Sequence, residues 1–359
     1  MYYEEIEAFC ERYDRTEKTY AFRADTPEQR EIWREKAAGR LKEISGLNMC
    51  RTTEGNYRCL DSRRMESYTK EYWIMDTEPG ITMPFYLLRP NQPNGAAILS
   101  LHGHGGGKET VVRDWSNPAV FTRPEKYKDA SLAEIMAEKG FFVLCPDERG
   151  SGERRESFQQ GDSAEAWRSC SHREIQQIAL GFGQSMLGLA IWDLMRLVDF
   201  AETIPEIRKG ALGCAGMSGG GLQTLWLAAL DQRICAAVTS GYFYGMRDSL
   251  IRMANNCSCN YVPFMWQTMD MGDLAAMIAP RPLFIESGEK DPLSGHRGLE
   301  NVYEQLDITM KAYALYHAED KLIHSVHPGG HVWNGTGVCE FFMENLCFIG
   351  QNSVSLKEQ

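Results

Sequence analysis

The feature of this sequence that most constrains its fold is the alternation of short apolar runs with longer stretches of helical periodicity. Between two of the runs, Leu187, Ile191 and Leu194 recur at helical spacing, and Pro205 follows the stretch. Strands that alternate with helices form parallel crossover units, which build a sheet covered on both faces. The sequence therefore predicts an α/β fold with a mostly parallel sheet. The runs are AAILSL (96–101), FFVLC (141–145), ALGCA (211–215), AAVTS (236–240), PLFIES (282–287) and KLIHSV (321–326).

Three other regions complete the predicted organisation. Two β-rich segments in 68–90 flank a Glu-Pro-Gly turn, which predicts an antiparallel hairpin ahead of the parallel strands. Residues 1–60 are polar with helical spacing, and we expect a helical extension packed on a catalytic domain at 61–359. An insertion around 242–275 is rich in aromatic residues and methionine. These side chains either wall a pocket or pack in the core.

Charge, the N-terminal sequence and cysteine content indicate the partners, the location and the redox state to expect. The net charge is −11 and no basic block stands out, which disfavours nucleic acid and anionic membranes as partners. The N-terminus lacks the basic and apolar regions of a signal peptide, so we expect a cytoplasmic protein. The expected partner is a small-molecule substrate. The eleven cysteines are scattered, which is typical of reduced thiols rather than a disulfide framework. Cys257 and Cys259 have no second pair at zinc-ligand spacing, so no metal is assigned.

The run at 211–215 leads into Gly216-Met217-Ser218-Gly219-Gly220, a serine between glycines at a corner from strand to helix. Such a corner strains the serine backbone so that the hydroxyl stands above the sheet, and the glycines remove side chains that would clash. The alternative interpretation is a glycine-rich turn with a capping serine. Since a serine hydroxyl is a poor nucleophile at neutral pH, a catalytic Ser218 requires a histidine and an acid nearby.

The acid and the histidine are expected after later strands, in the chain order serine, acid, histidine. Asp291 lies beyond the run at 282–287 and before a proline, so we predict it as the acid in preference to Glu286 or Glu289. His331 follows a glycine pair after the last run, which lets the chain turn back toward the serine, so we predict it as the base. The competing histidines are His317, His324 and His327.

Acyl transfer at a serine also needs two N–H donors for the developing oxyanion. The backbone N–H groups of Gly219, directly after the serine, and of His104, in the loop LHGHGGGKE, are the predicted donors. This glycine cluster alternatively forms a flexible loop. A phosphate-binding loop is excluded, because His102 stands where glycine is required and Glu109 where serine or threonine is required. No cofactor is predicted.

Taken together, these motifs resemble the α/β-hydrolase superfamily, in its dienelactone-hydrolase-like and acetyl xylan esterase-like branch of bacterial hydrolases. The resemblance spans about residues 68–335. It implies a cofactor-free serine hydrolase of carboxylic esters, with Ser218, Asp291 and His331 in the triad positions of the family. It also implies a structural role in ion pairs for Arg149. The segments that carry it are TEPGITMPFYLLRP, LHGHGG, CPDERGSGE, GLAIWDLMRLVDFAETIPEI, GMSGGG, CSCNYVP, DLAAMIAPRPLFIESGEKDP and HPGGHVWNG.

Two departures from the family pattern leave the substrate open. Dienelactone hydrolase is similar but uses a cysteine nucleophile, where this chain has Ser218. Acetyl xylan esterases typically carry Gln after the serine and Glu after the histidine, where this chain has Gly219 and Val332. The prediction is a short-acyl or acetylated-carbohydrate esterase. The alternatives are a serine peptidase or acyltransferase on the same fold, or a catalytically inactive hydrolase fold that serves as a binding protein.

Overall fold

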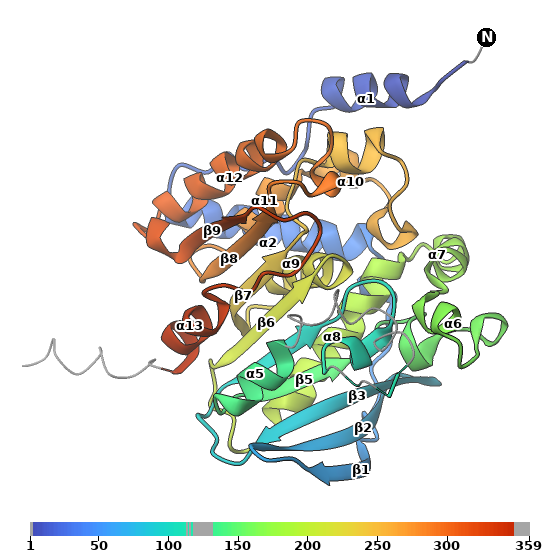
Figure 1. Cartoon of the computed structure of the whole chain (residues 1–359). Helices are drawn as coiled ribbons and strands as arrows, with labels where there is room; N and C mark the ends of the chain where they lie inside the picture. The colour runs from blue at the N-terminus through green and yellow to red at the C-terminus, as the bar shows by residue number, and fades with distance from the viewer. Residues whose placement is uncertain (1–2, 113, 115, 118–131, 348–359) are drawn as a thin grey trace, which may run out of the picture.

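The computed structural model describes residues 3–112, 114, 116–117 and 132–347. Within these residues, a nine-stranded sheet in the order β1-β2-β3-β5-β4-β6-β7-β8-β9 crosses the molecule (Figure 1). The pairs β1–β2, β2–β3 and β3–β5 are antiparallel, and the remaining neighbours are parallel. The strands are β1 (Arg58–Arg64), β2 (Tyr68–Glu78), β3 (Ile81–Pro90), β4 (Ala97–Leu101), β5 (Phe142–Pro146), β6 (Leu212–Met217), β7 (Ile234–Ser240), β8 (Leu283–Gly288) and β9 (Leu322–His327).

The predicted α/β fold is confirmed. The six apolar runs form β4 to β9, and the hairpin expected in 68–90 consists of β2 and β3, which pair from Tyr68 opposite Pro90 to Glu78 opposite Ile81. Strand β1 was not predicted, because its sequence RCLDSRR has no apolar alternation and all seven residues are exposed. The helical segment expected at 1–60 therefore runs into a strand at Arg58.

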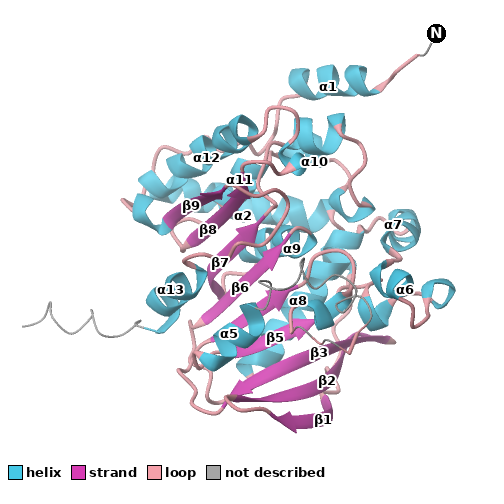
Figure 2. Ribbon diagram, viewed as in Figure 1, coloured by secondary structure: helices cyan, strands magenta, loops and turns pink. Residues whose placement is uncertain are grey.

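The core consists of two layers of apolar side chains, one on each face of the sheet. Along β4 and β5, Leu99 and Leu144 face one layer while Ile98 and Val143 face the other, as the two-residue period of a strand requires. Helices α2, α8 and α9 pack on the first layer, and α5 and α13 on the second (Figure 2). The helices are α1 (Ile6–Arg15), α2 (Pro27–Ile44), α5 (Leu132–Glu138), α6 (Ala164–Arg168), α7 (His172–Gly181), α8 (Met186–Glu202), α9 (Gly219–Leu230), α10 (Met265–Thr268), α11 (Met271–Ala276), α12 (Leu299–Ala314) and α13 (Val338–Phe342).

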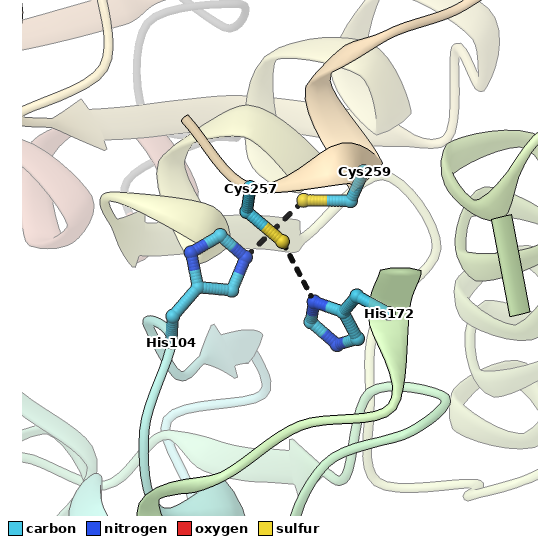
Figure 3. Close-up of side chains that lie close together, drawn as sticks. All are labelled: His104, His172, Cys257 and Cys259. Atoms are coloured by element: carbon cyan, nitrogen blue, oxygen red, sulfur yellow. Dashed lines mark hydrogen bonds between the residues drawn. The ribbon is translucent and has the colours of Figure 1, made fainter. Parts of the chain in front are cut away.

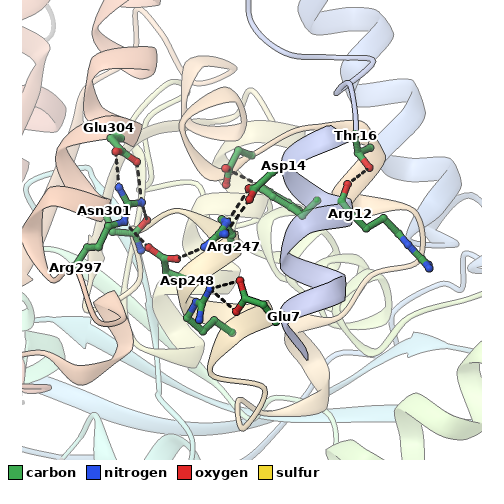
Figure 4. A network of polar contacts seen from close by, with 12 residues as sticks. Glu7, Arg12, Asp14, Thr16, Arg247, Asp248, Arg297, Asn301 and Glu304 are labelled. Carbon is green, nitrogen blue, oxygen red and sulfur yellow. Dashed lines mark hydrogen bonds and ion pairs between the residues drawn. The ribbon is translucent and has the colours of Figure 1, made fainter. Parts of the chain in front are cut away.

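The N-terminal helix α1 contacts the segment between β7 and β8. This segment contains the π-helix η5 (Arg247–Arg252) and the short 3-10 turn η6 (Ser258–Asn260). Asp14 of α1 accepts two hydrogen bonds from Arg247, at 2.7 and 2.8 Å, and Glu7 pairs with Arg252 (Figure 4). The hydroxyl of Tyr13 donates to Asp270 at 2.6 Å in a buried contact. The first helix is thus held to this segment by one buried hydrogen bond and two exposed ion pairs.

The strand order reverses at β4, which lies between β5 and β6. The loops that follow β4 and β6 therefore leave the sheet in divergent directions, and a crevice opens between them at the carboxyl edge. Among the described helices, none alone is long and apolar enough to cross a membrane. Helices α7 and α8 pass that test of length and composition only when taken together, and they meet at a bend of 99°.

Candidate active site

Ser218 occupies the corner between β6 and α9 in a strained backbone conformation, with φ 57° and ψ −117°. A side chain at Gly216 would run into the backbone of Gly220, and one at Gly220 would run into the carbonyl of Leu101. The Ser218 N–H donates to the Ser240 carbonyl at 2.8 Å and fixes the corner to β7. Close packing around the corner explains why glycines flank this serine.

The structure brings the three predicted triad residues together from loops after three different strands. The Ser218 hydroxyl lies 2.9 Å from His331 Nε2, and His331 Nδ1 lies 2.8 Å from Asp291 Oδ2. The other oxygen of Asp291 accepts the backbone N–H of Leu293 at 2.9 Å. With Nδ1–H donated to the carboxylate, Nε2 is free to accept the serine proton. This geometry allows proton transfer from Ser218 to His331 while Asp291 orients the imidazole ring.

Glu286 supports the histidine loop, a role that the sequence analysis missed. Its carboxylate accepts hydrogen bonds from the Ser240 hydroxyl at 2.6 Å and from the N–H groups of Asn334 and Gly335 at 2.9 and 2.6 Å. It is 1% exposed at the carboxyl end of β8. An acid inside an apolar strand was the available signal, because a buried carboxylate needs donors. Glu286 thus anchors the segment just after His331.

The competing histidines lie elsewhere. His324 is within β9, and its Nε2 lies 3.1 Å from the Ser287 hydroxyl; burial lowers the pKa of this imidazole to about 4. His327 is the last residue of β9, and its Nδ1 accepts the N–H of Gly329. His317 lies beyond the end of α12. Of these histidines and His331, only His331 is hydrogen-bonded to Ser218 among the described residues.

The loop after β4 runs alongside the serine corner. Gly105, Gly106 and Gly107 all have positive φ, at 98°, 146° and 71°, which lets the chain turn tightly there. A side chain at Gly103 would lie 3.6 Å from Ser218 Cβ. His104 lines the same pocket as Ser218, and its imidazole packs against Gly219. The segments that carry both predicted oxyanion donors are therefore adjacent to the nucleophile.

Buried ion pairs fix the neighbouring loop after β5. Arg149 donates to both oxygens of Asp193, at 2.8 and 2.7 Å, and to Glu78 at 2.7 Å, so its contacts are those of a structural arginine. The fully buried Lys108 donates to Asp147 at 2.9 Å. The Lys108–Asp147 pair holds the loops after β4 and β5 against each other, and the Arg149 pairs join the second of these loops to α8 and β2.

A cavity of about 280 Å³ opens beside the triad. Trp333 and Val332 come from the histidine loop, and no Lys, Arg, Asp or Glu belongs to the lining that the described residues form. The aromatic residues of the insertion are absent from this described lining, since Tyr242, Phe243 and Tyr244 are buried in the core. The lining residues are Ser100, Leu101, Gly103, His104, Gly105, Thr110, Val111, Leu132, Ala215, Gly216, Met217, Ser218, His331, Val332 and Trp333.

Comparison with known proteins finds a matching family and a related protein. The family model described as the Abhydrolase family matches residues 10–321. The chain is 26% identical over 240 residues to "Putative hydrolase YtaP" of Bacillus subtilis strain 168, a match that covers 66% of this chain and 74% of that protein.

Solved structures share the fold. A protein described as a "putative acetyl xylan esterase" from Bacteroides fragilis NCTC 9343 superposes with a TM-score of 0.75 at 21% identity, covering 91% of this chain and 83% of that one. A glucuronoyl esterase from Solibacter usitatus gives a TM-score of 0.67 at 14% identity, covering 92% and 96%. At these identities the likeness establishes the fold alone.

Proposed function

The chain belongs to the Abhydrolase family, and from this premise we propose that it is a serine esterase that hydrolyses short-acyl or acetylated carbohydrate esters. The observation that carries the proposal is the hydrogen-bonded series from Asp291 through His331 to Ser218 beside a cavity. The esterase names of several structural neighbours support the choice of an ester as substrate.

The mechanism proceeds in two steps. Ser218 Oγ attacks the ester carbonyl carbon while His331 Nε2 takes its proton, and the N–H groups of Gly219 and His104 hold the oxyanion. His331 then protonates the leaving alcohol and an acyl-enzyme remains. Water, deprotonated by the same imidazole, attacks the acyl carbon and releases the acid and free Ser218. Asp291 keeps the imidazole in the required tautomer throughout.

The cavity lining favours an uncharged ester. Apart from the imidazoles of His104 and His331, the described lining offers mostly apolar side chains and the ring of Trp333, and it contains no Lys or Arg that would hold a carboxylate or phosphate. An acetyl group fits such a wall, and the indole offers an aromatic surface for a sugar ring.

Replacement of Ser218 tests the assignment of the nucleophile. We expect Ser218→Ala to lower kcat for p-nitrophenyl acetate by roughly 10⁴- to 10⁶-fold, since loss of a triad serine removes the covalent route. Ser287→Ala, on β8 and outside the triad, is the matched control and should keep its turnover. Circular dichroism checks the fold of both variants. Retained turnover in Ser218→Ala would refute the assignment.

A substrate panel separates the esterase from its alternatives. Rates on p-nitrophenyl acetate, acetylated xylo-oligosaccharides and the methyl ester of glucuronic acid are compared with rates on peptide amides and with acyl transfer to an added alcohol. We expect ester hydrolysis to dominate. Faster amide cleavage would identify a peptidase, and faster transfer an acyltransferase. Failure of a fluorophosphonate probe to label Ser218 in folded protein would identify an inactive fold.

A further inference from the structure

Two cysteines and two histidines lie close together at the loop after β4. His104 comes from that loop, His172 begins α7, and Cys257 and Cys259 flank the start of η6 (Figure 3). His104 Nε2 lies 3.2 Å from Cys259 Sγ, and His172 Nδ1 lies 3.2 Å from Cys257 Sγ. One nitrogen or sulfur atom from each residue falls within 4.8 Å of the other three. We call these four residues the His/Cys cluster.

The spacing of the four atoms fits a small tetrahedral site. With Zn–S bonds of about 2.3 Å and Zn–N bonds of about 2.0–2.1 Å, tetrahedral ligands lie roughly 3.3–3.8 Å apart. The two nitrogen–sulfur distances of 3.2 Å are slightly shorter and the other pairs lie within 4.8 Å, so small side-chain shifts would bring the four atoms to this spacing. Thiolate and imidazole ligands in a tetrahedron select zinc over magnesium or calcium, which prefer oxygen. We propose that the His/Cys cluster binds one Zn²⁺ ion.

A second layer of groups orients His172 for this role. Its Nε2 lies 3.0 Å from the Ser151 hydroxyl and 3.6 Å from Glu148 Oε2. That carboxylate oxygen is buried without a hydrogen-bond partner among the described residues. Histidines that bind metals commonly donate their second ring N–H to an oxygen acceptor, which fixes the tautomer and raises ligand basicity. Here the second N–H points to Ser151 and Glu148 while Nδ1 faces the cysteines.

Zinc binding also has to account for the protons of the ligands. Thiolate and neutral imidazole are the forms that bind a metal, so Zn²⁺ displaces the protons on the ligand atoms, and these protons leave to solvent.

The site is closed, which assigns the ion a structural task. All four tetrahedral positions are filled by side chains, so no position remains for water or substrate. The ion links the loop after β4 to segments 68 and more than 150 residues further along the chain. Since the His104 ring packs on Gly219, this link steadies both segments of the proposed oxyanion site. The metal site itself does not depend on the proposed esterase function.

Metal binding to the full chain tests the proposal directly. Protein purified without added chelator is assayed for zinc by elemental analysis, then stripped and titrated with Co²⁺. We expect one zinc ion per chain and, with cobalt, the intense visible absorption of tetrahedral thiolate coordination. Zinc should displace the cobalt and abolish that absorption. A wild-type protein that takes up neither ion at the cluster would overturn the proposal, whatever its esterase activity.

Variants locate the ion. Cys257→Ser/Cys259→Ser should lose the zinc and the cobalt absorption, whereas Cys59→Ser, at an exposed cysteine outside the cluster, should keep both. Cys170→Ser asks whether the thiol beside Cys257 is a ligand, and we expect it to retain the ion. Metal retained at full stoichiometry by the double variant would overturn the assignment. So would mass spectrometry showing Cys257 in a disulfide in metal-free wild-type protein.

Discussion

Two histidine-containing clusters flank the loop after β4, and they differ in what surrounds the imidazole. In the triad, the His331 side chain is 27% exposed and faces a cavity, with Ser218 on one nitrogen and Asp291 on the other. In the His/Cys cluster, the His172 side chain is 0% exposed, whereas His104 is partly exposed and lines the same cavity as Ser218. An open imidazole can pass a proton to a substrate, whereas an enclosed one can only hold its neighbours. The buried His172 is therefore the imidazole that differs most from His331, the proposed base.

Asp291→Asn should have the largest effect among the tests of this contrast. The amide cannot accept the Nδ1–H, so His331 adopts the wrong tautomer and kcat should fall by about 10⁴-fold. The zinc content should stay unchanged, because no member of the His/Cys cluster contacts Asp291. Steady-state kinetics on p-nitrophenyl acetate and elemental analysis on the same sample measure both. A loss of metal together with activity would show that the two clusters act as one.

The sequence predicted the triad geometry because the fold dictates where its members lie. Once the apolar runs were assigned as strands, the carboxyl ends of β6, β8 and β9 were expected at one edge, and Ser218, Asp291 and His331 were the polar residues placed there. Most of the sheet was predictable for the same reason, since buried strands have apolar sequences. The exposed β1 lacks that pattern and was missed.

The His/Cys cluster was not predictable from spacing. The sequence assigned no metal because Cys257 and Cys259 lack a second pair nearby, and in the structure the partners come from the loop after β4 and from α7. Nothing local to His104 or His172 marks them as neighbours of an insertion far along the chain. Glu286 was missed for a similar reason, because its donors belong to the loop after β9. Contacts made by loops depend on tertiary structure that periodicity does not encode.

Glu286→Gln tests whether Glu286 positions the loop that carries His331 in the proposed triad. The neutral amide loses charge-assisted bonds to the N–H groups of Asn334 and Gly335, and the loop that carries His331 shifts. A misplacement of this kind costs about 100-fold in kcat with little change in KM. Glu289→Gln, whose exposed side chain lies just beyond the same strand, is the control and should match wild type. An unchanged kcat in Glu286→Gln would remove its positioning role.

Glu148→Gln tests the side of the His/Cys cluster. The carboxylate lies 3.6 Å from His172 Nε2, and loss of its charge makes the imidazole a weaker ligand. We expect the affinity for zinc to fall by about 10- to 100-fold, measured by competition with a chromophoric chelator. The triad should be untouched, so kcat of the zinc-loaded variant should equal that of wild type. Unaltered affinity would mean that Glu148 has no part in orienting His172.

Acid should destabilise the loop beside the His/Cys cluster, because the loop that carries Glu148 and Ser151 is anchored to Asp193 through Arg149 and Arg154. Burial alone would raise the pKa of the Asp193 carboxyl, but Arg149 and Arg154 outweigh burial and lower its pKa to about 2, from 3.8. A carboxyl with a lowered folded pKa stabilises the protein above its unfolded value and loses that contribution as the pH falls through the folded value. The contribution lost between about pH 4 and about pH 2 is about 2 kcal/mol.

Urea unfolding of wild type and Asp193→Asn across this pH range measures the contribution. The difference in unfolding free energy between the two proteins should shrink as the pH falls from about 4 to about 2, because protonation removes in wild type the charge that the variant already lacks. If the variant does not fold, the carboxyl carbon shift of Asp193 in selectively labelled wild-type protein gives its pKa directly. Parallel stability curves, or a pKa near the ordinary value for aspartate, would show that the ion pairs with Arg149 and Arg154 do not stabilise this loop. The loop that carries Glu148 and Ser151 would then be stabilised by the proposed zinc site rather than by these ion pairs.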